Sequence, residues 1–389
     1  MPGLYLHIPF CERKCIYCNF YSVENLAPRE RFLQALAREI DLRADQLSAV
    51  PDAPTEYSTI FFGGGTPSLL SPEQLGGIME SLRRRFAIAP DAEITMECNP
   101  GALTEGWLPG YRALGVNRLS FGVQSFHDDD LRFLSRIHTA AEARRGIAAA
   151  MEVFGNVSLD LIFALPGQTT QRWRSNLREG VALGTEHISA YALIFEEGTP
   201  LNAMRLSGSV SPAPDDLDAE MYAETMETLA EHGFGQYEVS NYAKPGRECR
   251  HNLGYWERQT YISFGPSAHS FLRREQQPQE RWANVSSLSA YLQQVEAGTL
   301  PVASRELLSS QLVLEEVVML GLRSRGVNRA DFRQAAGCDL AEYAPNTVAM
   351  LTAEGYATLS EHLLSMTPKG YPFADRFAVE LLMGEQRKA

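Results

Sequence analysis

The chain has 389 residues, of which 44% are hydrophobic and 21% charged, and its formal net charge is −13. This composition indicates a globular chain long enough for two or three domains, and the negative charge argues against binding to nucleic acid or to an anionic membrane surface. Residues 1–10 lack the basic start of a signal peptide and no run of 18 apolar residues occurs, so we expect a cytoplasmic protein.

The first two hundred residues alternate between strand and helix patterns. Residues 3–8 predict a short strand that stops before Pro9, and Pro28 opens a helix that runs to about Leu47. Repeated strand–helix units imply a parallel sheet with right-handed crossovers. We therefore predict a partial parallel (β/α)6 barrel over residues 1–200, with functional side chains at the C-terminal ends of its strands. Further strands are predicted at 58–62, 93–97, 117–123, 156–163 and 187–194, and further helices near 72–86, 104–114, 139–153 and 170–183.

A different pattern follows Pro200. We assign residues 201–304 to an extension of the barrel and residues 305–389 to a smaller, mainly helical C-terminal domain whose order of elements resembles a winged helix. That domain carries nine Lys/Arg against eleven Asp/Glu, so it lacks the basic face of a DNA reader, and we predict a structural or partner-docking role. The predicted elements are a loop at 207–215, a helix near 216–232, a strand near 235–240, a helix near 305–322, two shorter helices near 328–354 and strands within 356–366.

Three of the six cysteines fall within eight residues, directly after the first predicted strand. The clustering of Cys11, Cys15 and Cys18 favours a cofactor over disulfide bridges. Three thiolates on one loop can hold three irons of a [4Fe–4S] cluster and leave the fourth iron open to an external ligand. The alternatives are a zinc site, which would take a fourth ligand from His7 or a remote residue, and three unrelated buried cysteines.

This cysteine spacing after the first strand of a βα barrel resembles the radical S-adenosylmethionine (SAM) superfamily. The run Gly63–Pro67 (GGGTP) follows the second strand, where the superfamily places a glycine-rich loop against the amino group of the methionine. Residues without a Cβ let the backbone approach a ligand closely. Within the superfamily, the chain resembles the oxygen-independent coproporphyrinogen oxidases and the HemW heme chaperones. The resemblance is carried by LYLHIPFC, FFGGGTPS, MECNP, SFGVQSF, SRIH, LDLIFALPGQ, YEVSNYAKPG, CRHNLGYW and SFGPSAHS.

The resemblance implies a SAM-binding set spread over the strand ends. These residue types suit the ligand, because carboxylates accept hydrogen bonds from hydroxyls and ammonium while arginine can bind a carboxylate with two N–H groups. Taken alone, Glu97 or Asp160 could instead be a solvated strand-end carboxylate or a helix cap. The implied set is Tyr5 near the sulfonium, Tyr17 in the cluster loop, Gly64, Gly65 and Thr66 at the methionine, Glu97 at the ribose or the amine, Gln124 and Arg136 at the ribose and the carboxylate, Asp160 at the ribose hydroxyls and Ala192 near the adenine.

Two departures from the oxidase pattern favour the chaperones. The oxidase motif has a further cysteine where this chain has Phe20, and the oxidases carry a long N-terminal extension over the substrate where this chain has ten residues before Cys11. Such an extension encloses a radical and keeps it from side reactions. The HNxxYW motif, His251–Trp256, also resembles one found in the chaperones.

The HNxxYW motif suggests a heme site. Imidazole is a good axial ligand for heme iron, so His251 is the predicted ligand, and Tyr255 and Trp256 could lie against the macrocycle. In the alternative, His251 forms a hydrogen bond within a loop and the two aromatic residues belong to the core. The competing histidines are His7, His138 and His269, of which His7 is expected to stay at the cluster.

The resemblance therefore implies a heme chaperone that binds a [4Fe–4S] cluster, SAM and heme, and passes heme to a respiratory membrane protein. It implies a homodimer in the cluster-loaded state, a transient visit to the membrane and, if SAM is cleaved, a reduced flavodoxin or ferredoxin as electron donor. No residue is assigned a catalytic role. The enzyme alternative is a radical decarboxylase of coproporphyrinogen III. A nucleic-acid-modifying enzyme is disfavoured by the net charge of −13, and we expect no nucleic-acid partner.

Overall fold

The six predicted strand–helix units are present in the computed structural model, which describes residues 1–274 and 278–383. The last six residues of the predicted C-terminal domain lie outside the described residues. The barrel elements are β1 (Gly3–Ile8), α1 (Arg29–Ser48), β2 (Tyr57–Gly64), α2 (Pro72–Arg85), β3 (Ile88–Cys98), α3 (Leu108–Ala113), β4 (Arg118–Gln124), α4 (Asp128–Phe133), α5 (Ala140–Val153), β5 (Val157–Phe163), α6 (Thr170–Ala182) and β6 (His187–Ala192).

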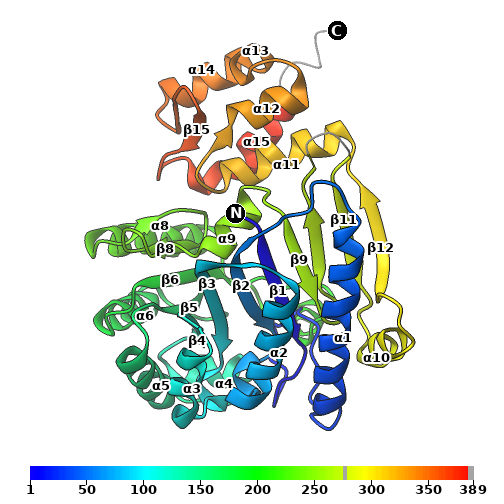
Figure 1. The fold of residues 1–389 in the computed structure, drawn as a ribbon. Helices are drawn as coiled ribbons and strands as arrows, with labels where there is room; N and C mark the ends of the chain where they lie inside the picture. The colour runs from blue at the N-terminus through cyan, green and yellow to red at the C-terminus, as the bar shows by residue number, and fades with distance from the viewer. Residues whose placement is uncertain (275–277, 384–389) are drawn as a thin grey trace.

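Strands β1 to β6 pair in sequence order and run parallel (Figure 1). Their outward faces carry apolar side chains that are fully buried beneath the helices, such as Leu4 and Leu6 of β1 and Phe62 of β2, and α1 supplies Phe32 and Leu36 from the other side. Among the described strands the sheet stays open. This confirms the predicted fold class, a partial parallel barrel with a helical C-terminal domain.

The capping box that opens α2 shows how the sequence sets a helix start. The Ser71 hydroxyl oxygen accepts a hydrogen bond from the Gln74 N–H at 3.2 Å, and the Gln74 side-chain oxygen accepts one from the Ser71 N–H at 3.0 Å. Pro72 stands at the first helical position, where its missing N–H removes no helical hydrogen bond. Helix α2 therefore begins at Pro72, after the short 3-10 turn Pro67–Leu69 that follows the glycine loop.

The extension of the barrel differs from the prediction. The strand expected at 235–240 is two short strands, and the predicted helix near 305 begins only at Ser310, because residues before it form an edge strand. Five of the six residues of that edge strand are exposed, so its sequence lacks the alternation of apolar and polar residues that would predict a strand. The elements are α7 (Pro200–Leu206), α8 (Asp215–Glu231), β7 (Gly235–Gln236), β8 (Asn241–Ala243), α9 (Arg250–Trp256), β9 (Tyr261–Phe264), β10 (His269–Leu272), β11 (Glu280–Asn284), α10 (Leu288–Glu296) and β12 (Val302–Leu307).

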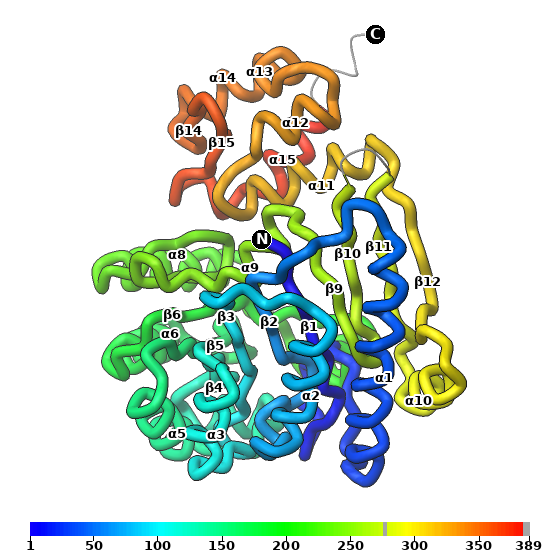
Figure 2. Tube along the Cα trace, viewed as in Figure 1, coloured from blue at the N-terminus to red at the C-terminus, as the bar shows by residue number. Residues whose placement is uncertain are grey.

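These added strands lengthen the barrel sheet at both edges. Strand β9 pairs parallel with β1, and β10 to β12 continue antiparallel beside α1, while β8 and β7 extend the sheet beyond β6 (Figure 2). The described strands therefore form one twelve-stranded sheet with the order β12-β11-β10-β9-β1-β2-β3-β4-β5-β6-β8-β7. The edge of the barrel at β1, where the cysteine loop begins, is thus covered and held in place.

A buried carboxylate joins α1 to this extension. Glu39 accepts hydrogen bonds from the Gly265 N–H at 2.8 Å, the Asn284 side-chain amide at 2.7 Å and the Tyr291 hydroxyl at 2.8 Å. Burial raises the pKa of Glu39, which the nearby Arg43 opposes. Arg43 is itself fully buried and lies with its guanidinium carbon 4.9 Å from the centre of the Trp282 ring. Polar groups on three separate elements thus depend on one side chain.

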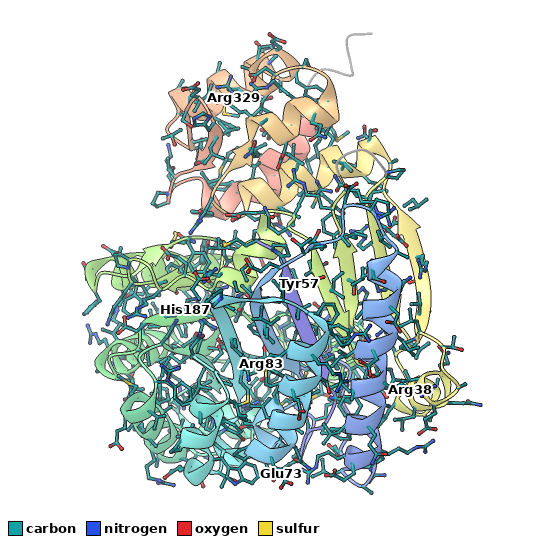
Figure 3. All side chains as sticks on the ribbon, in the orientation of Figure 1. Arg38, Tyr57, Glu73, Arg83, His187 and Arg329 are labelled. Atoms are coloured by element: carbon teal, nitrogen blue, oxygen red, sulfur yellow. The ribbon has the colours of Figure 1, made fainter. Side chains whose placement is uncertain are left out.

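The C-terminal domain has its own core and packs at the end of the barrel where the strands begin (Figure 1). Arg258, next to the start of β1, pairs with Glu316 of this domain at 3.0 Å. Tyr57 and His187, at the starts of β2 and β6, lie toward the same end (Figure 3). The elements are α11 (Ser310–Leu322), β13 (Val327–Asn328), α12 (Arg329–Ala336), α13 (Leu340–Tyr343), α14 (Pro345–Ala353), β14 (Ala357–Leu359), β15 (Leu363–Met366) and α15 (Ala374–Met383).

In this domain the helices come before the β14–β15 hairpin, as predicted, and β13 adds a third strand to the hairpin. Helix α15 follows the hairpin and was not predicted. Among the residues described, no helix combines the length and the apolar character needed to cross a membrane. Because the C-terminal domain packs where the strands begin, it lies at the opposite end of the barrel from the loops at the C-terminal ends of the strands. The site is expected at those loops.

Replacing Glu39 tests the junction between α1 and the extension. Glu39→Ala removes the acceptor of three buried donors and the stronger of the carboxylate charges acting on Arg43, so the free energy of unfolding should fall by at least about 3 kcal/mol. Urea denaturation followed by circular dichroism measures the loss. The control is Glu296→Ala, which removes the exposed ion pair with Arg31 between α1 and α10 and should leave the unfolding midpoint unchanged. Equal midpoints for the two variants would contradict the interpretation.

Candidate functional site

The three predicted ligand cysteines lie on one loop that begins where β1 ends. The Cys11 N–H donates to the Val23 carbonyl oxygen at 3.1 Å and the Val23 N–H donates to that of Pro9 at 2.7 Å, which closes the base of the loop. Within it, the Cys18 N–H donates to the Cys15 carbonyl oxygen at 3.2 Å. All three are free thiols, Cys15 buried and the other two half-buried. The loop therefore presents three sulfur atoms on one side of the barrel.

These cysteines line a cavity of about 560 Å³ together with every residue implied for SAM except Tyr5. The lining comes from the C-terminal ends of β1 to β6, where parallel barrels place their functional groups. The implied residues that the structure brings together here are Tyr17, Gly64, Gly65, Thr66, Glu97, Gln124, Arg136, Asp160 and Ala192. Residues that are far apart in the sequence thus share one hollow at the predicted end of the barrel.

Two side chains direct hydrogen-bond donors at the sulfur atoms. Arg136 donates to the Cys15 sulfur at 3.4 Å, and the Thr66 hydroxyl donates to the Cys11 sulfur at 3.5 Å. Burial acts to lower the pKa of Arg136, but Tyr17 and Cys15 outweigh it and raise that pKa, so the guanidinium keeps its charge. Burial raises the pKa of the Cys11 and Cys18 thiols. A fixed cation and a hydroxyl donor suit sulfur atoms that bind iron as thiolates.

The zinc alternative names His7 as a possible fourth ligand beside the three cysteines. His7 does not turn toward the cysteines, since its Nε2 lies 2.7 Å from the Tyr21 carbonyl oxygen and its Nδ1 lies 3.3 Å from the Tyr5 hydroxyl. Burial lowers the pKa of His7 to about 4, so the ring is neutral. His7 therefore supports the loop from below.

Two carboxyl groups lie on the wall opposite the cysteines. Glu97 accepts a hydrogen bond from the Gly64 N–H at 3.2 Å, and Asp160 accepts one from the Ser120 hydroxyl at 3.4 Å. Burial, followed by the charge of Asp160, raises the pKa of Glu97 to about 8. Burial also raises the pKa of Asp160, and the Ser189 hydroxyl opposes that effect. Such buried acids fit an ammonium group or sugar hydroxyls, which would favour their charged form.

The glycine loop owes its composition to its protein neighbours as well as to a ligand. A Cβ atom at Gly64 would lie 2.6 Å from the His7 ring, and one at Gly65 would lie 2.7 Å from the carbonyl oxygens of Ile8 and Phe10. Gly64 also has φ +104°, a conformation that side chains disfavour. From the sequence, these glycines are expected to let the backbone approach a ligand. The structure shows that they also let the glycine loop approach β1 and the residues that follow it.

Tyr5 lies beneath the cavity, in the interior of the barrel. Its ring stacks at 6.2 Å on Phe61 and at 6.4 Å on His251, measured between ring centres. It does not line the cavity in this structure, so its predicted contact with the sulfonium stays a prediction. The ring instead forms part of the layer between the cavity and the HNxxYW helix.

His251 is buried on α9, at the end of the barrel opposite the cavity. Its Nδ1 lies 2.7 Å from the Thr59 hydroxyl and its Nε2 lies 2.8 Å from the Tyr255 hydroxyl, so both ring nitrogens have hydrogen-bond partners. Burial lowers the pKa of His251 to about 3. This is the internally bonded arrangement that the sequence left open as an alternative. The role of His251 as a heme ligand stays a prediction, and it requires one of these hydrogen bonds to break.

Sequence reasoning missed the residue that holds α9 in place. Glu93 accepts hydrogen bonds from the backbone N–H groups of Arg250 and His251, both at 3.0 Å. It lies four residues before Glu97 on β3, and the even spacing puts both carboxylates on the inner face of the barrel. The sequence places Glu93 on a predicted strand, but only the fold brings it to a helix about 157 residues away. Ser120, Asn99 and Tyr191, which also line the cavity, were missed as well.

Comparison with known proteins gives two matching family models, and relatives that align with most of the chain. The radical SAM superfamily model matches residues 5–179, and the HemN C-terminal domain model matches residues 308–373. The chain is 35% identical to the heme chaperone HemW of Bacillus subtilis (strain 168), covering 95% of this chain and 96% of that protein. It is 38% identical to the heme chaperone HemW of Mycobacterium tuberculosis (strain ATCC 25618 / H37Rv), over 83% of this chain and 82% of that protein.

Among solved structures, the chain is similar to coproporphyrinogen III oxidase (HemN) from Escherichia coli, described as a radical SAM enzyme. The TM-score is 0.80 with 22% sequence identity, covering 98% of this chain and 89% of that one. At this identity the similarity establishes the fold alone. It extends over the barrel, the added strands and the C-terminal domain together.

Gly64→Ala tests the close contact with His7. The new methyl group would meet the imidazole ring at 2.6 Å, and the backbone would be strained at φ +104°, which costs of order 1–3 kcal/mol. We expect a lower melting temperature and less iron bound per chain after anaerobic reconstitution. The control is Gly77→Ala on α2, where nothing lies within 4 Å of the added atom, and where alanine should stabilise the helix by about 0.5–1 kcal/mol. A Gly64→Ala protein that matches the control would contradict the interpretation.

Glu97→Gln tests the buried acid. The folded chain keeps the Glu97 proton up to about pH 8, whereas the unfolded chain releases it near 4.5. Between these values the folded state binds more protons, so the contribution of Glu97 to stability falls as pH rises. Glutamine cannot ionise, so the variant should gain stability relative to the wild type between about pH 5 and about pH 8. Melting temperatures of both proteins without SAM measure the difference, and a difference that does not change with pH would refute the assignment.

Proposed function

Because the chain belongs to the HemW family of the radical SAM superfamily, we propose that it is a heme chaperone that also holds a [4Fe–4S] cluster and SAM. The observation that carries the proposal is the 35% identity over 95% of the chain to a protein named as a heme chaperone. The cavity supports the cofactor part, since three thiols and the polar strand ends share one lining. The heme is therefore proposed from the relatives, and the cluster and SAM are supported in addition by the residues that line the cavity.

In this proposal, Cys11, Cys15 and Cys18 hold three irons of the cluster and SAM reaches the fourth. Arg136 keeps a positive charge beside the Cys15 sulfur and can share it with the carboxylate of the ligand. Glu97 and Asp160 accept hydrogen bonds from its ammonium and hydroxyl groups. When bound, the cluster supplies one-electron chemistry at the C5′–S bond of SAM, given an electron from a reduced flavodoxin or ferredoxin.

The partners belong to the proposal as well. Heme is proposed because the relatives are heme chaperones, and a respiratory membrane protein is the proposed recipient. We propose that the cluster-loaded chain forms a homodimer, works in the cytoplasm and visits the membrane only transiently. A nucleic acid has no part in this proposal, because the net charge of −13 opposes its binding.

A second candidate is the oxidative decarboxylation of coproporphyrinogen III. The shared fold with the oxidase from Escherichia coli favours it, but that similarity carries the fold alone. Phe20 stands where the oxidase motif continues with a cysteine. Turnover of coproporphyrinogen III by the reconstituted protein, with SAM and a reductant present, would establish the enzyme in place of the chaperone.

The test of the chaperone is a hemin titration of the anaerobically reconstituted protein, followed at the Soret band. We expect saturable binding by the wild type. Weaker binding by His251→Ala would assign the heme site to the HNxxYW helix, because an axial imidazole ligand would be lost. The control is His232→Ala, which should bind as the wild type does. His232 directly follows α8, and its ring nitrogen lies 2.8 Å from the Thr228 carbonyl oxygen. Absence of saturable binding by the wild type would overturn the heme chaperone. Unchanged binding by His251→Ala would remove His251 from the heme site.

A further inference from the structure

Large apolar side chains are exposed around the mouth of the cysteine cavity. Phe20 is 68% exposed, Ile194 is 64% exposed and Tyr191 is 40% exposed, and all three belong to the lining of this one cavity. A gathering of exposed apolar groups at the rim of a polar hollow marks a binding surface more often than a chance arrangement. The polar residues described above account for the floor of the cavity and leave this rim unexplained.

The rim is built from two sides of the barrel. Phe20 follows Cys18 on the loop after β1, whereas Tyr191 and Ile194 stand at the end of β6, so the first and the sixth strand of the barrel each contribute. The two sides are tied together directly, because the Leu201 N–H at the start of α7 donates to the Ile16 carbonyl oxygen at 3.0 Å. The apolar groups therefore face one shared opening.

Positive charge stands on the same rim. Arg13 and Lys14 are exposed and line the cavity, and neither side chain takes part in an ion pair found among the described residues. Among the acidic residues of the lining, Glu97 and Asp160 belong to the floor and Glu196 follows β6, while Glu24 accepts a hydrogen bond from the Lys14 N–H at 2.8 Å. In the rest of the lining, Arg136 is engaged with Cys15 and with the Gly122 carbonyl oxygen. Arg13 and Lys14 are thus available to an acidic ligand at the mouth.

We propose that heme binds across the mouth of the cysteine cavity, with its macrocycle on Phe20, Tyr191 and Ile194 and its two propionate carboxylates at Arg13 and Lys14. This rests on the proposed function and adds the place where heme binds. A flat apolar ring with two acidic arms matches a rim of large apolar side chains flanked by two cations. His251 offers no such surface, because it is buried and both of its ring nitrogens have hydrogen-bond partners.

Heme in this position would cover the entrance to the SAM-binding residues. Tyr191 belongs both to the apolar rim and to the strand that carries Ala192, the residue implied at the adenine. Bound heme and free SAM therefore compete for passage through one opening, although they contact different residues. The protein would take up SAM before heme, or release heme before exchanging SAM.

The test is a hemin titration of the cluster-loaded full chain with substitutions on the rim. Phe20→Ser with Ile194→Ser, and separately Arg13→Glu with Lys14→Glu, should each raise the Kd for hemin by about tenfold or more. The matched control is Leu307→Ser on the far edge strand β12, which removes an apolar side chain that is 65% exposed and should leave the Kd unchanged. Iron content per chain is measured in every variant, and variants with wild-type iron are compared.

Two further measurements separate the outcomes. SAM added after hemin should bind at least about tenfold more slowly than SAM added first, and equal rates would overturn the placement of heme over the mouth. Wild-type binding of hemin with unchanged affinity in both rim variants would overturn this inference while leaving the chaperone intact. No hemin binding by the wild type would instead defeat the proposed function. Loss of self-association in the rim variants with unchanged hemin affinity would assign the rim to a second copy of the chain.

Discussion

The cavity depends on the close contact between β1 and the glycine loop that ends β2. The Gly65 N–H donates to the Ile8 carbonyl oxygen at 2.8 Å and the Thr66 N–H donates to that of Phe10 at 2.7 Å, so the loops after two neighbouring strands are joined through their backbones. A Cβ atom at Gly65 would lie 2.7 Å from both oxygens, and only glycine fits. This contact sets Thr66 beside the Cys11 sulfur, and the neutral ring of His7 supports both loops from below.

The barrel keeps two different polar sites at its two ends. Strand β3 serves both, because Glu97 points into the cavity and Glu93 holds the start of α9, which carries His251. Between them lies the aromatic layer of Tyr5 and Phe61, which stacks on the His251 ring. The C-terminal domain packs at the α9 end, so a partner could dock there without covering the cysteine loop (Figure 1). Heme binding at the cavity mouth and heme binding at His251 are therefore two distinct hypotheses. The substitutions on the rim test the first, and His251→Ala tests the second.

Much of the barrel could be predicted from the sequence, because its strands are short runs of buried residues and its helices repeat apolar residues at regular spacing. The capping box at Ser71 and the cysteine spacing after β1 are local signals of the same kind. Strands β9 to β12 could not be predicted, since they are short and β12 is almost wholly exposed. For such strands the pairing partner is chosen by tertiary contacts, and Glu39 reaches across from α1 to secure it.

The sequence by itself determined the strand–helix order of the barrel and the cysteine spacing after its first strand, because both are local patterns, and its resemblance to a known superfamily implied the set of site residues. It could not determine which of them touch. That Arg136 donates to Cys15, that Tyr5 lies below the cavity and that His251 is hydrogen-bonded at the other end are outcomes of how the strands and helices pack. The same holds for the exposed rim of Phe20, Tyr191 and Ile194, since exposure is a property of the packed chain. Periodicity records which side of an element is buried, whereas only the packed fold decides which buried or exposed groups become neighbours.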